Sequence, residues 1–345
     1  MINLEMGIDP HELLNRDPIK ISPDTSYLSG RRILVTGAGG SIGSALCERL
    51  ATIDLGDLIM LDRDESALHS TQLSITGRAL LDDASTVLAD IRDLPAIKKI
   101  MDVRRPEIVF HAAALKHQPL LERHPSEAWK TNVIGTANVL RAAKDCGVIR
   151  FINVSTDKAA NPTCVLGASK RIAERVVSSY TWGQYTSVRF GNVLNSRGSV
   201  LETFMRQLNS GMALTVTDPR MRRYFIMINE AISLLLHAGS VGKTEEVIIM
   251  DMGEPVSIDE IARKMIDASG LDTNITYTGI RRGEKINESL LGTGETYTRP
   301  NHPLIKHVRV PPLNQINEIC EKHIDNENDE DMTKLMHSMC EWTTE

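Results

Sequence analysis

The chain has 345 residues, enough for one large domain or two unequal ones. Its formal net charge of −6, without any basic block, argues against nucleic acid as a partner. No apolar run approaches the ~20 residues of a membrane helix, and the five cysteines are scattered without a CxxC pair, which argues against a zinc site and a disulfide framework.

Residues 1–30 form a polar lead-in that is acidic at its start and interrupted by prolines. This composition does not fit a secretory signal, and with the cysteine pattern it predicts a cytoplasmic protein. His111, His117 and His124 lack the spacing of a metal motif, so no metal site is predicted.

From residue 32 onward, short apolar segments alternate with amphipathic ones. This alternation is typical of a parallel sheet whose two faces are both covered by helices. The sequence therefore predicts an α/β protein of the Rossmann type, with a doubly wound parallel sheet. The expected strands are 32–35, 58–61, 87–89, 108–110, 151–154 and 187–190, and the expected helices include 41–52 and 65–76.

The pattern loosens beyond the last of these strands, where loops rich in Gly, Pro and Arg alternate with helices such as 258–269. We expect a Rossmann domain over 31–190 and a smaller C-terminal substrate-binding lobe over 191–345, from which some segments, such as 247–250, return to the sheet. In the tail we expect two helical stretches around the acidic run 325–331, which is interpreted as a solvated turn.

Gly37, Gly40 and Gly43 follow the first expected strand at GxxGxxG spacing and open a helix. Glycine suits such a turn because the backbone must approach a pyrophosphate without a Cβ in the way. Ser41 and Ile42 then stand at the helix N-terminus, where free N–H groups and the dipole favour phosphate. A tight turn without a ligand is the alternative, but the strand–turn–helix context favours a dinucleotide site.

Asp62 ends the second expected strand, where its carboxylate can accept hydrogen bonds from an adenosine ribose. Because a 2′-phosphate would meet this carboxylate, NAD is the predicted cofactor. Arg63 keeps NADP open, since its guanidinium could accommodate that phosphate. The other predicted cofactor contacts are Asp90, Ile91, Ala112, Ala113, Asn132 and Lys170.

Three further segments are expected outside the carboxyl ends of the strands, where parallel sheets bind ligands. They are HAAALKH (111–117), TNVIGTANV (131–139) and NVSTDKAANPTCVLGASKR (153–171). With the glycine loop they resemble the extended short-chain dehydrogenase/reductase family, and in particular the configuration-retaining UDP-N-acetylglucosamine 4,6-dehydratases of polysaccharide biosynthesis. The resemblance covers nearly the whole chain through ELLNRDPIKI, RFGNVLNSRGSV, LTVTDPRMRRYF, DMGEPVSI and GIRRGEKINESLL. Long members carry additional N-terminal membrane segments, so the chain resembles the short cytoplasmic forms.

The resemblance implies a lyase whose cofactor takes a hydride from the sugar and later returns it to the same sugar. NAD would remove hydride from carbon 4 of a UDP-linked N-acetylhexosamine, which makes the carbon 5 proton acidic. The carbon 6 hydroxyl would then leave and the hydride would return to carbon 6. The implied product is UDP-4-keto-6-deoxy-N-acetylglucosamine with retained configuration at carbon 5.

Asp157 and Lys158 match the acid–base pair of that family. We expect Asp157 to act as the acid toward the carbon 6 hydroxyl and Lys158 as the base at carbon 5, so each needs its less usual protonation state. Attraction within the pair opposes both states and desolvation favours both, and the sequence leaves the outcome open. A surface ion pair is the alternative interpretation.

Lys170 matches the lysine of the YxxxK motif and would bind the nicotinamide ribose. Thr156 matches a hydroxyl that would contact the carbon 4 oxygen, and Asn132 would hold the active-site loop or the nicotinamide region. Leu166 stands at the tyrosine position of the motif and cannot accept a proton, so Lys170 must do so directly or through Thr156 or a water. This departure keeps open a non-catalytic NAD-binding regulator.

A nucleotide diphosphate needs cations, and arginine suits it best. Arg223 and Arg281 match family positions for this clamp. Lys116 is expected nearer the sugar, Asn192 at the diphosphate, and the backbone of 214–216 at uracil. Leu166 is also expected to line the substrate site.

Two more predictions concern alternatives and partners. A nucleotide-sugar 4-epimerase or ketoreductase on the same scaffold is the second enzyme hypothesis, which Asp157, Lys158 and the missing tyrosine argue against.

A homodimer or higher homo-oligomer is expected because, in this fold, helices such as 131–143 and 167–179 often pack against a partner's copies.

Overall fold

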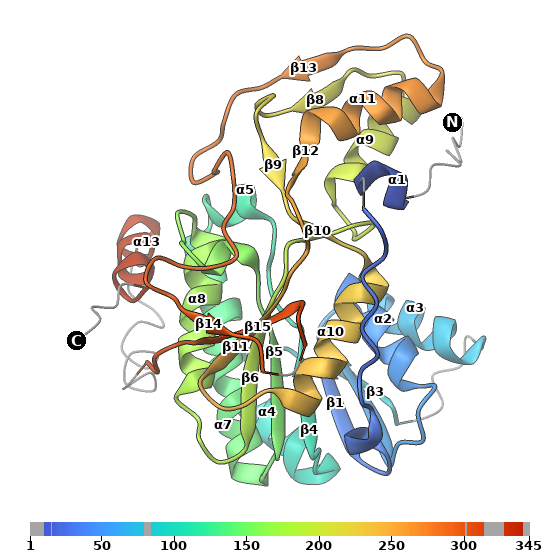
Figure 1. The fold of residues 1–345 in the computed structure, drawn as a ribbon. Helices are drawn as coiled ribbons and strands as arrows, with labels where there is room; N and C mark the ends of the chain where they lie inside the picture. Colours follow the sequence, from blue (N-terminus) through green and yellow to red (C-terminus); the bar gives the residue numbers. More distant parts are fainter. Residues whose placement is uncertain (1–9, 15, 79–83, 301, 314–327, 341–345) are drawn as a thin grey trace.

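The computed structural model describes residues 10–14, 16–78, 84–300, 302–313 and 328–340 (Figure 1). A large domain built on a parallel sheet carries a smaller lobe above one end of its strands (Figure 1). The predicted α/β class is therefore confirmed.

The sheet has nine strands in the order β14-β15-β11-β6-β5-β4-β1-β2-β3. All neighbours from β3 to β11 are parallel, whereas β15 and β14 add antiparallel strands at one edge. The order reverses between β1 and β4, which opens a crevice at the carboxyl ends of these two strands, where sheets of this kind bind ligands. The strands are β1 Arg32–Thr36, β2 Asp57–Asp62, β3 Thr86–Leu88, β4 Ile108–His111, β5 Arg150–Val154, β6 Gln184–Arg189, β11 Glu246–Met250, β14 Tyr297–Thr298 and β15 Ile305–Arg309.

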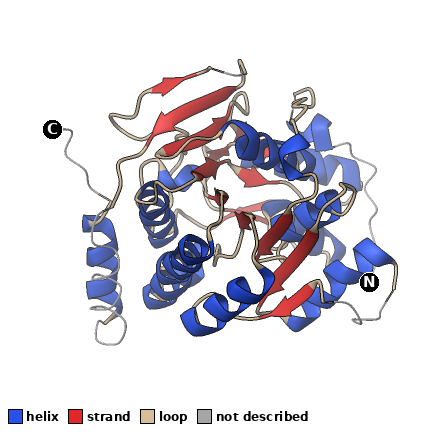
Figure 2. Cartoon of the chain, turned by 90° about the horizontal axis from the view of Figure 1, so that it is seen from below, coloured by secondary structure: helices blue, strands red, loops and turns tan. Residues whose placement is uncertain are grey.

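Alternate strand residues supply two separate cores, one on each face of the sheet. In β1, Leu34 packs with one core, and its neighbours Ile33 and Val35 pack with the other. Because side chains of a strand alternate between faces, a nearly continuous apolar run serves both cores. Figure 2 shows the strands in the middle of the domain with helices packed around them.

The two faces carry different sets of helices. Helices α2 Ser41–Leu50, α3 Glu65–Thr76 and α10 Ile228–Val241 cover one face. The other face is covered by α4 Leu94–Arg104, α7 Thr136–Cys146, α8 Val165–Ser178 and α13 Asp329–Ser338. Short elements between β4 and α7 are α5 Gln118–Leu121, α6 Pro125–Ala128 and a π-helix, η2 Trp129–Gly135.

The smaller lobe has its own apolar core between α1 Pro10–Leu14, α9 Val200–Asn209 and α11 Ile258–Ser269. Three two-stranded sheets complete it: β7 Asn192–Val193 with β10 Phe225–Ile226, β8 Leu214–Val216 with β13 Ile275–Tyr277, and β9 Arg222–Arg223 with β12 Val256–Ser257. Residues 192–226 lead directly from β6 into this lobe, so the lobe is held over the carboxyl ends of the strands.

The C-terminal tail differs from its prediction. Asp329, Glu330 and Asp331 form the first turn of α13 and do not lie in a solvated turn, because acidic side chains are favourable at a helix N-terminus and Asn328 caps the helix. Residues 325–327 and the first predicted tail helix lie outside the described residues. Met332 and Met336 of α13 are buried in the core that α8 shares.

Helix α8 has little free surface. All its residues except Arg175 are buried, and α13 packs along it (Figure 1). The segment 167–179 that we expected to meet a second copy is therefore covered largely by other elements of the same chain, α13 among them. Among the described residues, no helix has the length and apolarity to cross a membrane.

Candidate active site

The glycine loop forms the floor of a cleft between β1 and β4. A Cβ at Gly37, whose φ is 71°, would stand 2.5 Å from the backbone nitrogen of Ala113 in the loop after β4. A Cβ at Gly43 would overlap the carbonyl oxygen of Gly37. Gly40 is the N-cap of α2, so the helix points its free N–H groups at the cleft. The local geometry fits a dinucleotide pyrophosphate.

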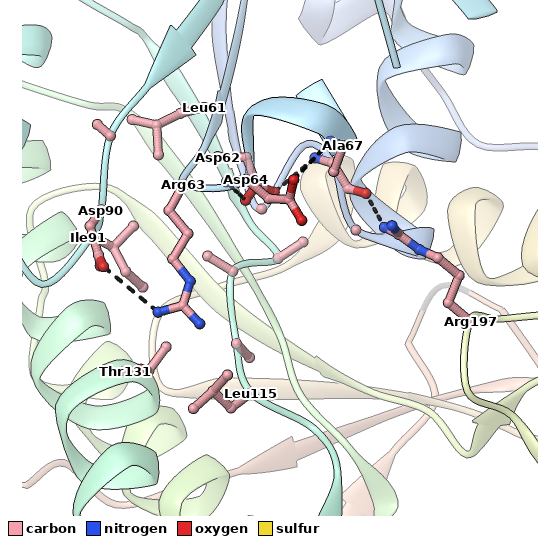
Figure 3. Close-up of a pocket in the computed structure, with 17 residues that line it drawn as sticks. Leu61, Asp62, Arg63, Asp64, Ala67, Asp90, Ile91, Leu115, Thr131 and Arg197 are labelled. Carbon is pink, nitrogen blue, oxygen red and sulfur yellow. Dashed lines mark hydrogen bonds and ion pairs between the residues drawn. The ribbon is translucent and has the colours of Figure 1, made fainter. Parts of the chain in front are cut away.

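A cavity of about 240 Å³ lies beside this loop, at the ends of β1, β2 and β4 (Figure 3). Asp62 lines it, and its carboxylate accepts hydrogen bonds from the backbone nitrogens of Gly39 at 2.8 Å and Asp64 at 3.0 Å. These bonds fix the carboxylate at the end of β2, where an adenosine ribose would meet it. The predicted cofactor residues that line this cavity are Gly37, Gly40, Asp62, Arg63, Asp90, Ile91, Ala112 and Ala113.

Arg63 points across the cavity to Asp90, with 3.7 Å between the guanidinium and the carboxylate (Figure 3). Asp90 also binds Arg92 at 2.7 Å. Burial raises the pKa of Asp90, but the hydrogen bonds and charges of Arg92 and Arg63 outweigh it, so that this pKa falls below its ordinary value. Asp90 therefore keeps its negative charge beside Arg63, which works against a free arginine waiting for a 2′-phosphate.

A second, larger cavity of about 640 Å³ continues from the first and leads under the smaller lobe. The two share Gly40, Ala112, Ala114, Leu115 and Arg197. Its wall combines the start of α2, the loop after β5, the start of α8 and the loop from β7 to α9. The predicted residues that line it are Ser41, Ile42, Gly43, Lys116, Thr156, Lys158, Leu166, Lys170 and Asn192.

The acid–base pair lies at the end of β5. Lys158 Nζ is 3.0 Å from Asp157 Oδ1 and 3.3 Å from the side-chain oxygen of Asn192. Thr156 donates its hydroxyl to the same Asp157 oxygen at 3.0 Å. Asp157 is fully buried and does not line the cavity, and its Oδ2 has no hydrogen-bond partner. It therefore reaches the cavity only through Thr156 and Lys158.

Burial and attraction to carboxylates have opposite effects on the pKa of Lys158, and the sequence left open which effect is larger. Burial lowers the pKa of Lys158, but Asp157 and the Glu288 carboxylate, 3.9 Å from Nζ, raise it more, so this pKa lies above its ordinary value. The side chain is thus an ammonium in this state of the protein, and it needs to lose a proton before it can act as a base.

Lys170 differs from Lys158 because, among the described residues, it forms no ion pair with a carboxylate. Burial lowers its pKa from 10.5 to about 8, an effect that Glu174 opposes. Such an amine exchanges protons near physiological pH, as a general base should. Leu166 lies one helical turn before it and lines the same cavity, so the wall is apolar where the YxxxK tyrosine would stand.

Three predicted contacts lie elsewhere. Asn132 is buried and clamps the loop after β4, through bonds with the backbone of Leu115 and a bond of 3.0 Å to Ser169, and it does not line either cavity. Arg223 is buried and donates to the carbonyl oxygens of Arg222 and Ile286. Arg281 is exposed and lines neither cavity.

The backbone of 214–216, which was expected to contact uracil, forms hydrogen bonds within the smaller lobe. In β8, the backbone nitrogen of Leu214 donates to Asn274, and that of Thr215 donates to the Gln207 side chain. The carbonyl oxygen of Val216 accepts from Thr278. The backbone of 214–216 thus holds the lobe together.

Arg197 was missed by the sequence reasoning. It lies in the loop before α9, lines both cavities and donates from its guanidinium to the carbonyl oxygen of Gly39 (Figure 3). Its backbone nitrogen binds the Ser41 hydroxyl at 3.0 Å, and its carbonyl oxygen accepts from Lys116 Nζ at 2.7 Å. Only its position in the RFGNVLNSRGSV block could have drawn attention to it.

A buried ion network was also missed. Arg189 on β6 binds Glu174 of α8 at 2.7 Å and Glu295 at 2.6 Å, and all three side chains are fully buried. Arg171 joins both carboxylates, and Ser155, next to Thr156, donates to Glu174 at 2.6 Å. The network ties the loop that bears the acid–base pair to α8 and to the segment around residue 295. No spacing in the sequence indicates that these four charges meet.

The chain belongs to the polysaccharide biosynthesis protein family, whose model matches residues 33–310. It is 41% identical over 309 residues to the probable polysaccharide biosynthesis protein EpsC of Bacillus subtilis, covering 86% of this chain and 51% of EpsC. It is 40% identical over 348 residues to the capsular polysaccharide biosynthesis protein CapD of Staphylococcus aureus, with 97% and 58% covered. The chain thus spans about half the length of these two relatives. A UDP-glucose 4-epimerase of Rickettsia akari is 33% identical over 274 residues, with 76% of this chain and 78% of the epimerase covered.

Solved structures share the fold. Pen from Bacillus thuringiensis matches with a TM-score of 0.74 at 26% identity, covering 90% of this chain and 98% of Pen. DesIV, a dTDP-glucose 4,6-dehydratase of Streptomyces venezuelae solved with NAD, matches with a TM-score of 0.68 at 23% identity, covering 76% and 88%. The chain thus shares its fold with a nucleotide-sugar dehydratase, and its sequence relatives include a nucleotide-sugar epimerase, in agreement with the resemblance to short-chain dehydrogenases/reductases.

Proposed function

We propose that the protein is an NAD-dependent nucleotide-sugar 4,6-dehydratase of glycan biosynthesis, with UDP-N-acetylglucosamine as its substrate. The observation that carries this proposal is that Thr156, Lys158 and Lys170 face one cavity, together with the glycine loop at the start of α2. The cavity adjoins a second one that Asp62 lines, so a dinucleotide bound along the glycine loop would end beside the three side chains.

The chain's own residues would divide the work as follows. Bound NAD would supply a hydride acceptor that returns the hydride later. Lys170 would take the proton of the carbon 4 hydroxyl, directly or through Thr156, since Leu166 offers no proton acceptor. Lys158 would remove the carbon 5 proton once it has itself lost a proton, and Asp157 would assist departure of the carbon 6 hydroxyl through Thr156 or Lys158, because it does not face the cavity.

The substrate would enter under the smaller lobe. Lys116 and Asn192 line the cavity there and would contact the sugar and the diphosphate. Arg223 and Arg281 lie outside the cavity walls, so they would bind the diphosphate only after a movement of the lobe.

Isotope transfer tests the reaction. We expect UDP-N-acetylglucosamine deuterated at carbon 4 to give a product with deuterium at carbon 6 of the same sugar, followed by NMR. Unlabelled substrate in heavy water should acquire deuterium at carbon 5 with retained configuration. These two results together would support dehydration by the proposed route.

The second candidate is a 4-epimerase, which the relative in Rickettsia akari favours. It predicts that deuterium stays at carbon 4 of an epimerised product. Bound NAD without any turnover would favour the regulator hypothesis, with Leu166 as its simplest explanation.

The homodimer stays a prediction. Residues 131–143 are buried within the chain except Arg141, and α8 is buried except Arg175, so a second copy would meet what these helices leave exposed and the outer surface of α13. Light scattering that shows a monomer at micromolar concentration would count against it.

A further inference from the structure

Glu288 is a buried carboxylate beside the acid–base pair, and it comes from a distant part of the chain. It lies in the segment between β13 and β14 and is 8% exposed. Its Oε1 is 3.9 Å from Lys158 Nζ, and its Oε2 has no hydrogen-bond partner although Lys285 Nζ lies 3.5 Å away. Burying a carboxylate costs free energy, so the place of Glu288 between Lys158 and Lys285 calls for a reason.

The surroundings of Lys158 make it the shared partner of two acids. Asp157, at the end of β5, lies 3.0 Å from Lys158 Nζ. Glu288, in the segment between β13 and β14, lies 3.9 Å from the same nitrogen. The positive groups that face the cluster are Arg223 on β9, which lowers the pKa of Lys158, and Lys285 beside Glu288. Other titratable groups near the cluster include Cys164 at the N-cap of α8, Tyr224, whose pKa is raised by burial and by carboxylates that include Asp157, and Lys170, which lines the same cavity.

Glu288 is joined to the catalytic loop by its own segment. Lys285 donates to the carbonyl oxygen of Asn161, and Thr163 donates to that of Gly283 at 3.0 Å. A Cβ at Gly283 would stand 2.9 Å from the Cβ of Cys164, so the two segments are in close contact. The position of Glu288 relative to Lys158 is therefore fixed by packing and does not depend on the ion pair alone.

We propose that Glu288 is a positioning residue that sets the protonation state of Lys158, holding it as an ammonium between two carboxylates until substrate fills the cavity. This inference rests on the proposed function, because it assigns Lys158 a proton-transfer role. Asp157 lies 3.0 Å and Glu288 3.9 Å from Nζ, so either carboxylate is placed to receive the Lys158 proton when the free amine is needed. The total charge of the buried group then stays constant and only the position of a proton changes.

The test measures Lys158 directly and needs no substrate. Holoenzyme is treated briefly with acetic anhydride over a range of pH, and acetylation of Lys158 and Lys170 is quantified by mass spectrometry. Only the free amine reacts, and a charge a few ångströms away shifts a pKa by about 1 unit or more, so Glu288→Gln should raise the Lys158 rate about tenfold at pH 8–9. The Lys158 to Lys170 ratio corrects for access to the cavity that both line.

Matched variants separate charge from structure. Glu284→Gln, on the same segment, should leave the ratio as in the parent protein, and Glu288→Asp should bring it most of the way back. An unchanged ratio in a folded Glu288→Gln protein would overturn the inference. The isotope experiment tests the proposed reaction, whereas the acetylation ratio tests the effect of Glu288 on Lys158. Each proposal can therefore be contradicted independently of the other.

Discussion

The guanidinium of Arg197 donates a hydrogen bond to the carbonyl oxygen of Gly39, although 158 positions separate them in the chain. The bond connects the smaller lobe to the loop that would hold the cofactor phosphates. We predict that Arg197→Ala weakens NAD binding about tenfold to a hundredfold, because a charge-assisted contact contributes on the order of 1.5–3 kcal/mol. Calorimetric titration of cofactor-free protein measures this, with Arg206→Ala on α9 as the control. Equal affinity in the Arg197 variant and the parent would refute it.

Asp62 should decide the choice of cofactor. Its carboxylate is fixed at the end of β2 by two backbone N–H groups, and Arg63 is engaged with Asp90. We expect purified protein to carry NAD, and Asp62→Ser to narrow its preference over NADP, since the repulsion of a 2′-phosphate is removed. Nucleotide extracted from the protein and separated by chromatography gives the answer, and mainly NADP in the parent protein would contradict the prediction.

The pH dependence of the first chemical step should follow Lys170. Its pKa is lowered to about 8, so the amine is charged below that pH and free above it. A base must be free, and the single-turnover rate of NADH formation should therefore rise with pH up to about 8 and then level off. A rate that falls over this range would exclude Lys170 as the base.

The same measurement separates two residues. Lys170→Ala should abolish NADH formation, whereas Asp157→Asn should leave this step intact and block elimination. Product NMR shows the second effect. Equal loss of NADH formation in both variants would refute this division of roles.

The buried network around Arg189 should matter for stability. Arg189→Met leaves Glu174 and Glu295 buried with only Arg171 between them, and breaking a buried ion pair costs about 3–5 kcal/mol. The free energy of unfolding in urea is the measurement. Arg309→Met is the control, since it removes an exposed pair with Glu245, and such pairs contribute about 0–1 kcal/mol.

The parallel sheet and the cofactor loop could be predicted because their signals are local. Gly37, Gly40 and Gly43 sit within one strand–turn–helix unit, and Asp62 follows at the end of the next strand, so short-range pattern places all four. Thr156, Lys158 and Lys170 lie on one continuous segment, 153–171, and their roles were expected from its resemblance to the dehydratase family.

Glu288, Arg197 and Glu295 could not be predicted in this way. Each reaches the site from the C-terminal half of the chain, and its distance from the catalytic loop depends on how the smaller lobe packs. The protonation state of Lys158 was open for the same reason, because Glu288 adds the second negative charge. Likewise, the burial of Asp157 behind Thr156 and Lys158 depends on tertiary packing that adjacent sequence positions do not report.

The sheet order has a consequence for the synthesis of the protein. The interior strand β6 pairs with β5 on one side and with β11 on the other, and β11 in turn pairs with β15. A nascent chain that has emerged only through α10 thus exposes one edge of β6, with unpaired N–H and C=O groups that can pair with another chain. We expect the incomplete protein to be vulnerable to aggregation at this stage. Glu246–Met250 closes the edge of β6 when it leaves the ribosome, and the free edge of β11 is closed in turn by β15.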